Sequence, residues 1–223
     1  PDYETQDSYS IRLRTTDSSG ESYVEAFTIG IKDLNETPTD IAVSSSSLNE
    51  NIDAESVVAT LSSTDVDAVD THSYALVEGT GDTDNDSFTI DASNLIINSS
   101  PNYESKSSYS IRIKTTDSGG ESYVEVFSLS VNDLNETPTD LSISSSSFNE
   151  NIDAESVVAT LISTNVDSGD THIYSLVDGT GDKDNDVFSI DGSNLDFNSS
   201  PDFETKTPIA FDYIQQIAVV EVT

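Results

Sequence analysis

Alternating hydrophobic and polar residues mark the clearest elements of the chain. The segment YSIRIKT places Tyr109, Ile111 and Ile113 on one face and polar residues on the other. The segment YVEVFSLSVND, residues 123–133, alternates in the same way. A two-residue period is typical of a β-strand with one dry face and one solvated face. Both segments are therefore predicted to be strands, and shorter strands are predicted over residues 57–61, 72–77, 88–90 and 95–98.

The whole pattern recurs with an offset of 100 residues. The motif DLNETPTD occupies residues 33–40 and 133–140, and PDYET at Pro1 returns as PNYES at Pro101 and PDFET at Pro201. This period matches a small β-sandwich domain, and about seven strands without helical periodicity predict an all-β fold of tandem Greek-key sandwiches. The expected boundaries are 1–36 for the closing part of one module, 37–136 for a complete module and 137–223 for a third.

Acidic residues dominate the charge of the chain. Its 223 residues include 42 acidic ones against 8 Lys and Arg, for a net charge of -34, and no cysteine. Nucleic acid and anionic membranes are excluded as expected partners, because both attract basic surfaces. No apolar run approaches the roughly 20 residues that span a bilayer, so no membrane insertion is predicted. Adaptation to salt is an alternative source of the acidity, but the acids recur at fixed repeat positions.

Oxygen-rich motifs follow one another in a fixed order within the period: NEN, DVD, NYE, TTD and DLNETP. This ordered set resembles the calcium motifs of the cadherin family, and the resemblance covers the chain except its C-terminal tail. It implies cadherin-like sandwiches in a rod, with Ca²⁺ at each junction between modules. It also implies a calcium-rigidified structural or adhesion segment of a large extracellular bacterial protein, on the cell surface or secreted. Because the chain opens in mid-motif, we expect it to be a fragment of that protein.

The resemblance implies the metal ligands residue by residue. At the first junction they are Asp2, Glu4, Asp33, Asn35 and Glu36 from the upper module, and Asp65, Asp67 and Asp117 from the lower one. At the second junction they are Glu50, Asn102, Glu104, Asp133, Asn135 and Glu136, met by Asn165 and Asp167. At two of these positions, 102 and 165, a neutral amide replaces a carboxylate of the family pattern.

The chemistry of these side chains agrees with the resemblance. Calcium takes six to eight oxygen ligands from carboxylates and carbonyls. Two carboxylates about 5 Å apart repel by roughly 3 kcal/mol at an effective dielectric constant of about 20. A junction without metal is therefore expected to splay, and a divalent cation to hold it together. A solvated acidic linker is the alternative interpretation.

A second acidic motif, DTDND at residues 82–86, returns as DKDND at residues 182–186. It is either an additional metal site or a polar turn between strands, because the glycine and closing glutamate of an EF-hand are missing. No nucleophile elbow or phosphate-binding loop is found, so no enzyme is predicted. The histidines, His72 and His172, each begin a strand and are expected to be structural.

A carbohydrate- or surface-binding sandwich is the competing functional class. Its partner would be a glycan or protein of a cell surface or the extracellular space. Sugar-binding platforms present exposed aromatic side chains, especially tryptophan, and the chain has no tryptophan. Strand alternation places Tyr23 and Tyr123 toward a core.

The third repeat changes after Lys206. Residues 207–223 read TPIAFDYIQQIAVVEVT, where the repeat would continue as in SSYSIRIKTTDSGGESY from Ser107. With synonymous codons chosen to fit, a shifted reading frame gives SYSIRLYTTDSGGGSY, which agrees with most of residues 108–123. We hypothesise a single-nucleotide frameshift near Lys206. Ile217 then stands where the repeat has Asp117, and the alternating residues 209, 211 and 213 predict a substitute strand.

Overall fold

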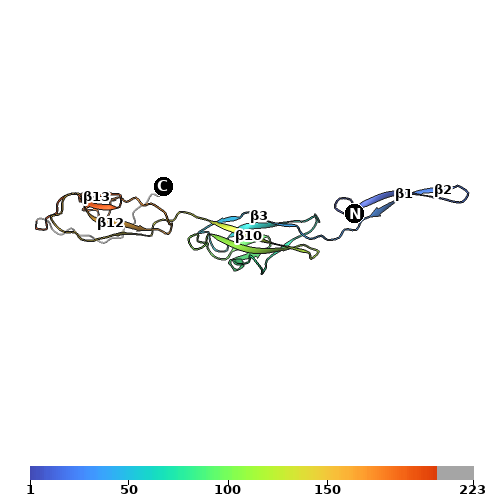
Figure 1. Cartoon of the computed structure of the whole chain (residues 1–223), viewed down its shortest axis with the longest axis horizontal. Coiled ribbons are helices and arrows are strands. Elements are labelled where there is room, and N and C mark those ends of the chain that lie inside the picture. Colours follow the sequence, from blue (N-terminus) through green and yellow to red (C-terminus); the bar gives the residue numbers. More distant parts are fainter. Residues whose placement is uncertain (205–223) are drawn as a thin grey trace. The chain divides into compact units, whose positions relative to one another are not determined.

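The computed structural model describes residues 1–204, so the expectations for residues 207–223 lie outside the described part. The chain forms two compact units, Pro1–Leu134 and a second that begins at Asn135. The described residues form strands and loops, apart from two single-turn 3-10 helices, η1 (Asn85–Ser87) and η2 (Asn185–Val187) (Figure 1). Within residues 1–204, no helix is long and apolar enough to cross a membrane. The predicted all-β class is confirmed.

Unit 1 begins with an isolated hairpin. Strands β1 (Ser8–Thr16) and β2 (Ser22–Gly30) pair antiparallel, with Ser8 opposite Gly30. Tyr23 is 64% exposed, so the prediction that it faces a core is wrong. Among the described residues, no second sheet covers the apolar face of this hairpin. Tyr123, by contrast, packs partly buried against the core of the complete module.

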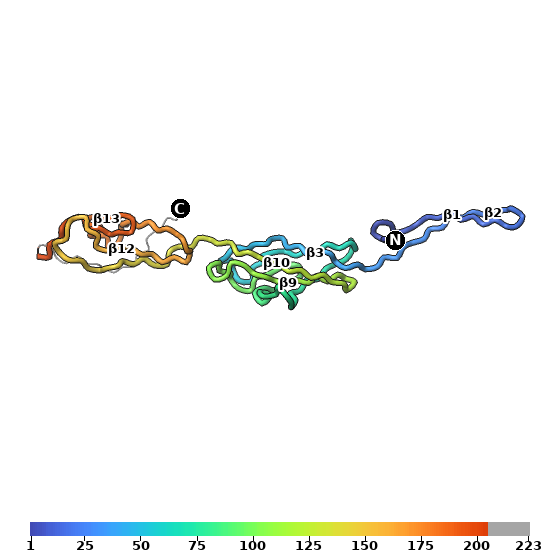
Figure 2. The backbone as a smooth tube through the Cα atoms, viewed as in Figure 1, coloured from blue at the N-terminus to red at the C-terminus, as the bar shows by residue number. Residues whose placement is uncertain are grey.

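The complete module of unit 1 consists of two four-stranded sheets. Figure 2 traces the backbone of this module and labels its strands β3, β9 and β10. Their orders are β3–β5–β8–β7 and β4–β10–β9–β6. All neighbours pair antiparallel except β4 and β10, which run parallel. The predicted strands are all present, and β3 and β4 are short successive segments that lie in different sheets. The bounds are β3 (Asp40–Val43), β4 (Ser47–Asn49), β5 (Val57–Thr64), β6 (Ser73–Leu76), β7 (Phe88–Asp91), β8 (Asn94–Ile97), β9 (Ser108–Thr116) and β10 (Ser122–Asn132).

The hydrophobic core of this module lies between the two sheets. Ile111 and Ile113 of β9 are fully buried together with Leu95 of β8, as the alternating pattern predicts. The ring of Phe88 meets Tyr109 edge-on, with 5.2 Å between the ring centroids. Burying one large apolar side chain is worth about 1.5–3 kcal/mol. Much of the stability of the module therefore depends on the contact of β9 and β10 with the opposite sheet.

The motif at residues 82–86 forms a polar turn that is tied to β9. Asp84 accepts a hydrogen bond from the backbone N–H of Ser110 at 2.7 Å and pairs with Lys106 Nζ at 2.9 Å. Asn85 donates to the carbonyl of Val77 and accepts from the N–H of Arg112. These contacts connect the end of β6 to β9 and support the polar-turn interpretation.

Unit 2 repeats one sheet of the complete module. Its order is β11–β12–β14–β13, which is the order β3–β5–β8–β7 shifted by 100 residues. Phe197 is fully buried and its ring packs against those of Phe148 and Phe188. The bounds are β11 (Asp140–Ile143), β12 (Ser156–Thr164), β13 (Phe188–Asp191) and β14 (Asn194–Phe197).

Candidate metal centres

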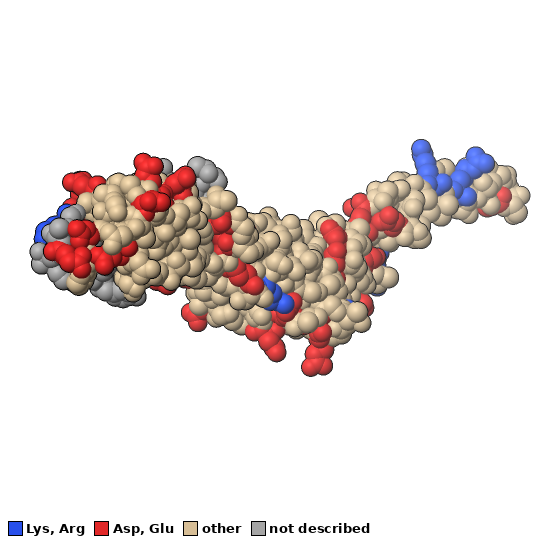
Figure 3. Space-filling view, turned by 60° about the vertical axis from the view of Figure 1, so that its left-hand side comes forward, with Lys and Arg blue, Asp and Glu red and all other residues tan. Residues whose placement is uncertain are grey.

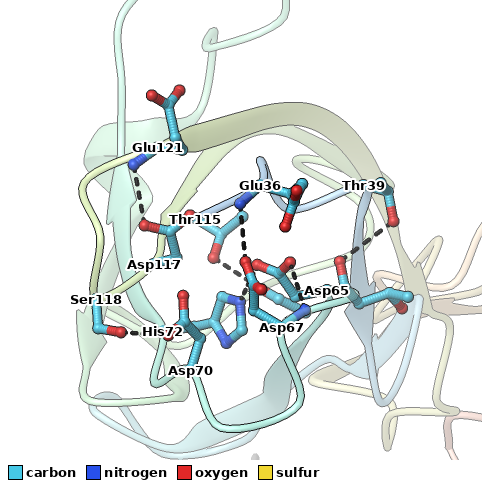
Figure 4. A network of polar contacts seen from close by, with 12 residues as sticks. Glu36, Thr39, Asp65, Asp67, Asp70, His72, Thr115, Asp117, Ser118 and Glu121 are labelled. Carbon is cyan, nitrogen blue, oxygen red and sulfur yellow. Dashed lines mark hydrogen bonds and ion pairs between the residues drawn. The ribbon is translucent and has the colours of Figure 1, made fainter. Parts of the chain in front are cut away.

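The first linker is fixed by its backbone to an acidic turn of the complete module (Figure 4). The N–H of Glu36 donates to Asp67 Oδ2 at 2.8 Å, and the N–H of Thr39 donates to the carbonyl of Thr64 at 2.8 Å. Asp67 is only 8% exposed, and its own N–H donates to Asp65 Oδ1 at 3.3 Å. The DVD motif after β5 thus folds back on itself and presents its carboxylates to the linker.

Four carboxylates predicted at the first junction converge on one point. Glu4 lies before β1, Asp33 and Glu36 lie in the linker, and Asp67 follows β5. Each contributes one oxygen, and these oxygens all lie within 4.8 Å of one another. Three separate segments of unit 1 therefore meet in a donor set that consists only of oxygen.

A second acidic group lies beside the first. Asp65, Asp70 and Asp117 bring one oxygen each to within 4.8 Å of one another. Asp117 accepts hydrogen bonds from the N–H groups of Gly120 and Glu121 and from Asn35 Nδ2, the last at 3.1 Å. The turn after β9 and the linker are thereby held at the same carboxylate.

Asp70 was not predicted from the sequence. Its Oδ1 accepts from Ser118 Oγ at 2.6 Å, and its Oδ2 is buried without a hydrogen-bond partner among the described residues. The signal was present in the repeat, because DVDAVD returns as NVDSGD with Asp170 in the same place. His72 supports this group, since its Nε2 lies 3.1 Å from Asp65 Oδ2.

Gly119 permits the close approach of the linker. A Cβ atom at this position would lie 1.8 Å from Asn35 Oδ1, much closer than any non-bonded contact allows. The equivalent residue of the isolated hairpin is Ser19, where the described structure has no linker to accommodate. Glycine at residue 119 therefore lets Asn35 reach Asp117.

The two groups shift carboxyl pKa values in opposite directions. Burial, joined by the negative charges of Glu4 and Asp67, raises the pKa of Glu36 above its usual value. The pKa of Asp117 is lowered, because burial acts to raise it but the hydrogen bonds from Asn35 and from backbone N–H groups outweigh that effect. The linker carboxylates are thus poorly compensated without a cation.

The raised pKa of Glu36 gives a testable pH dependence. Below pH 4.5, the usual pKa of this carboxyl in an unfolded chain, Glu36 is protonated in both the folded and the unfolded state. It then does not lower the free energy of unfolding. As the pH rises through the folded value, ionisation in the crowded site becomes a cost to the folded state. With all divalent ions chelated, the melting temperature of the wild type should therefore fall more than that of Glu36→Gln between pH 4.5 and pH 7. Equal slopes for the two proteins in a thermal melt series would contradict this.

The ligands predicted at the second junction fall into both units. Within unit 1, Glu50, Glu104 and Asp133 bring one oxygen each to within 4.8 Å of one another. Glu50 is only 1% exposed. Its Oε2 accepts from the N–H of Tyr103 at 2.8 Å and its Oε1 from the N–H of Leu134 at 2.7 Å. This buried carboxylate therefore joins the turn before β9 to the residue that ends the unit.

Two predicted ligands, Asp2 and Asn102, accept hydrogen bonds within local turns. Asp2 accepts from the N–H of Thr5 at 3.3 Å and from its hydroxyl at 2.9 Å, and it lies outside the convergent carboxylates. Asn102 occupies the equivalent position in the next repeat, and its Oδ1 accepts from the N–H of Ser105 at 2.7 Å. Asp2 of PDYET and Asn102 of PNYES thus each stabilise a turn before the following strand.

Unit 2 repeats the geometry of the first linker. The N–H of Glu136 donates to Asp167 Oδ2 at 2.7 Å, and Asn135 Nδ2 donates to the carbonyl of Glu136 at 3.1 Å. Asn165 donates to that same carbonyl at 3.3 Å and to Asp170 Oδ2 at 3.0 Å. Asp167 Oδ1 is buried and has no hydrogen-bond partner in the described part of the chain.

One further acidic group in unit 2 was not predicted. Glu150, Asp202 and Glu204 bring one oxygen each to within 4.8 Å of one another, and all three are exposed. The 100-residue offset was the signal that could have found them, because they correspond to the predicted residues 50, 102 and 104.

The donor sets fit calcium. They contain carboxylates, with the side-chain amides of Asn35 and Asn165 beside them, and calcium prefers oxygen ligands of this kind. The buried oxygens without a partner, on Asp70 and Asp167, mark positions where a cation would supply the missing interaction. Without one, several carboxylates within 4.8 Å of one another leave uncompensated repulsion.

Comparison with known proteins finds solved structures with a similar fold. No protein-family model matches the chain, and no curated protein matches its sequence. A structure of protocadherin gamma B7 extracellular cadherin domains 1–4 matches with a TM-score of 0.63 and 19% identity, over 92% of this chain and 52% of that one. Human protocadherin-24 EC1-2 matches with a TM-score of 0.59 and 19% identity, over 78% of this chain and 82% of that one. The human desmocollin-1 ectodomain matches with a TM-score of 0.57 and 18% identity, over 92% and 42%.

The chain spans about half the length of the first of these structures. At 18–19% sequence identity, the similarity to these structures shows a shared fold alone. The first two matched structures contain successive cadherin domains, and the likeness extends over 92% and 78% of this chain. The chain therefore has a cadherin-like repeat architecture.

Proposed function

We propose that the chain is a calcium-binding segment of a large extracellular protein, where calcium stiffens successive modules for a structural or adhesive role. The convergence of Glu4, Asp33, Glu36 and Asp67 carries this proposal. An extracellular location is in keeping with the cadherin ectodomains that share the fold. A bacterial surface or secreted protein, the module boundaries 1–36, 37–136 and 137–223, and a glycan or protein partner are part of the same proposal.

At the first linker, the proposal assigns two sets of side chains to two ions. Glu4, Asp33, Glu36 and Asp67 would hold one ion, and Asp65, Asp70 and Asp117, with Asn35 beside them, would hold another. The bound ion would supply positive charge that turns mutual repulsion into attraction. The backbone bonds of residues 36 and 39 to the module position the linker for that purpose.

Residues at the second linker would act in the same way. Glu50, Glu104 and Asp133 form the group in unit 1. In unit 2, Glu136, Asn165 and Asp167 belong to the set proposed from the repeat, together with Asn135. Asn102 and Asp2 would contribute less, because their side chains fold turns.

A calcium titration tests the proposal. After treatment with a chelator, calorimetric titration should show binding with dissociation constants of roughly 0.1–1 mM, as for other extracellular modules. The melting temperature should rise over the same range, and small-angle scattering should report a narrower distribution of dimensions. Magnesium at the same concentration serves as the control, because its smaller, octahedral shell suits these groups less well. Absence of both heat and stabilisation would refute the proposal.

A further inference from the structure

Asp65 of the complete module and its counterpart Asn165 in unit 2 occupy the same local turn. The N–H of Asp67 donates to Asp65 Oδ1 at 3.3 Å, and the N–H of Asp167 donates to Asn165 Oδ1 at 3.4 Å. The two side chains therefore place one oxygen alike. They differ in the second terminal atom, which is a carboxylate oxygen in Asp65 and an amide nitrogen in Asn165. The carboxylate oxygen accepts hydrogen bonds, whereas the amide nitrogen donates them.

In the complete module, the carboxylate of Asp65 belongs to a group with too few donors (Figure 4). Asp65, Asp70 and Asp117 each bring one oxygen to within 4.8 Å of the others. Asp70 Oδ2 is buried there, and no group within residues 1–204 donates a hydrogen bond to it. A buried carboxylate oxygen of this kind requires a partner, and a cation can be that partner.

In unit 2, the amide of Asn165 supplies a donor to the equivalent carboxylate. Its Nδ2 donates to Asp170 Oδ2 at 3.0 Å and to the carbonyl of Glu136 at 3.3 Å. Asp170 is the counterpart of Asp70 in the 100-residue repeat. The carboxylate that lacks a partner in the complete module is therefore already hydrogen-bonded in unit 2.

The histidine beside each group reflects the same exchange. His72 Nε2 lies 3.1 Å from Asp65 Oδ2. His172 Nε2 is buried and, among the described residues, has no hydrogen-bond partner. The atom without a partner is thus a carboxylate oxygen in the complete module and a histidine nitrogen in unit 2. Calcium prefers oxygen ligands, so the histidine nitrogen does not replace the oxygen that unit 2 has lost.

The overall charge does not distinguish the two linkers. Acidic side chains are spread over the visible faces of unit 1 and unit 2, and basic side chains are few (Figure 3). A negative field of this kind raises the local concentration of a cation near both linkers. A difference in calcium binding between the linkers therefore depends on the groups that would hold the ions.

We propose that Asn165 does with its amide group what a calcium ion does beside Asp65, so that the second linker stiffens only at a higher calcium concentration than the first. This inference rests on the proposed function, because it takes calcium as the ion that stiffens the linkers. The second linker still responds to calcium, since Asp167 Oδ1 is buried without a partner among the described residues. The affinity of a calcium site depends on the number of charged ligands, so we expect the two midpoints to differ by about tenfold.

Fluorescence energy transfer across each linker tests the order of stiffening. The chain has no cysteine, so Thr28→Cys with Thr89→Cys reports on the first linker, and Thr89→Cys with Ser189→Cys reports on the second. All three positions are exposed and lie on strands. During a calcium titration, the distribution of distances across the first linker should narrow at about tenfold less calcium than that across the second.

The outcomes of this titration separate the inference from the proposed function. If both distributions narrow at the same calcium concentration, the inference is overturned and the proposed function stands. If neither distribution narrows, both fail.

Exchange of the two side chains tests the cause. Asp65→Asn should raise the calcium midpoint of the first linker about tenfold, and Asn165→Asp should lower that of the second by a similar factor. The double variant has the net charge of the wild type, so its overall field is unchanged, and it should stiffen its second linker first. A double variant with the order of the wild type would overturn the assignment to these residues.

Thermal melting gives an independent measurement on Asn165→Asp. With calcium chelated, the melting temperature should fall, because the two amide hydrogen bonds are lost and a carboxylate faces Asp170. Calcium should reverse this loss. Ser199→Asp is the matched control, since it adds the same charge at an exposed position of unit 2 and should change neither the melting temperature nor the calcium midpoints. Equal effects of Asn165→Asp and Ser199→Asp would contradict the proposal.

Discussion

Glu50→Ala is expected to lower the free energy of unfolding of unit 1 by about 3–5 kcal/mol. The carboxylate is 1% exposed and accepts hydrogen bonds from the N–H groups of Tyr103 and Leu134. A hydrogen bond to a charged group contributes about 1.5–3 kcal/mol, and the substitution leaves both buried donors without an acceptor. The loss should be present with and without calcium, because these two bonds do not depend on an ion.

Urea denaturation of the variant measures this loss. Glu150→Ala is the matched control: it removes the equivalent residue of unit 2, which is exposed and accepts from the N–H of Phe203 at 3.1 Å. We expect that control to cost about 1 kcal/mol or less. A loss below about 1 kcal/mol for Glu50→Ala would show that the turn and the linker find other acceptors.

Asp67→Ala is expected to weaken calcium binding at the first linker by at least about tenfold, or roughly 1.4 kcal/mol. It removes one of four convergent carboxylates, and the affinity of a calcium site depends on the charge of its ligands. It also removes the acceptor of the Glu36 N–H, so the linker loses its backbone attachment to the DVD turn. Binding at the second linker should be unchanged.

Calorimetric titration of the variant separates these effects. Asp91→Asn, at the exposed end of β7 and outside the acidic groups, calibrates the loss of one negative charge away from the site. If Asp67→Ala and Asp91→Asn weaken binding equally, the convergence of residues around Asp67 has no special role. A selective loss for Asp67→Ala supports the proposed centre.

Much of the fold could be predicted because the side-chain period is a local property. Tyr109, Ile111 and Ile113 alternate in the sequence and are buried in the structure. Tyr23 lies in a segment with the same alternation, yet it is exposed. Alternation tells which residues share a face, but burial also requires a second sheet opposite that face.

The candidate site was predictable in part for a different reason. Ordered motifs and the resemblance identified carboxylates that do converge, such as Glu4, Asp33 and Asp67. Asp70 was missed because it lies in the turn beyond the DVD motif, although the repeat retains it as Asp170. Asp2 and Asn102 were assigned by motif position alone, and local hydrogen bonds with the residue three positions later decide where their oxygens point.

The pairing of β4 with β10 has a mechanical consequence. These strands lie near the beginning and the end of the complete module and run parallel, joining residues 47–49 to residues 130–132. Tension applied to the two ends of the module would pull the strands past each other along their length. The hydrogen bonds between them would then be loaded together rather than opened one after another, so the module should resist stretching better than a hairpin that is peeled from one end.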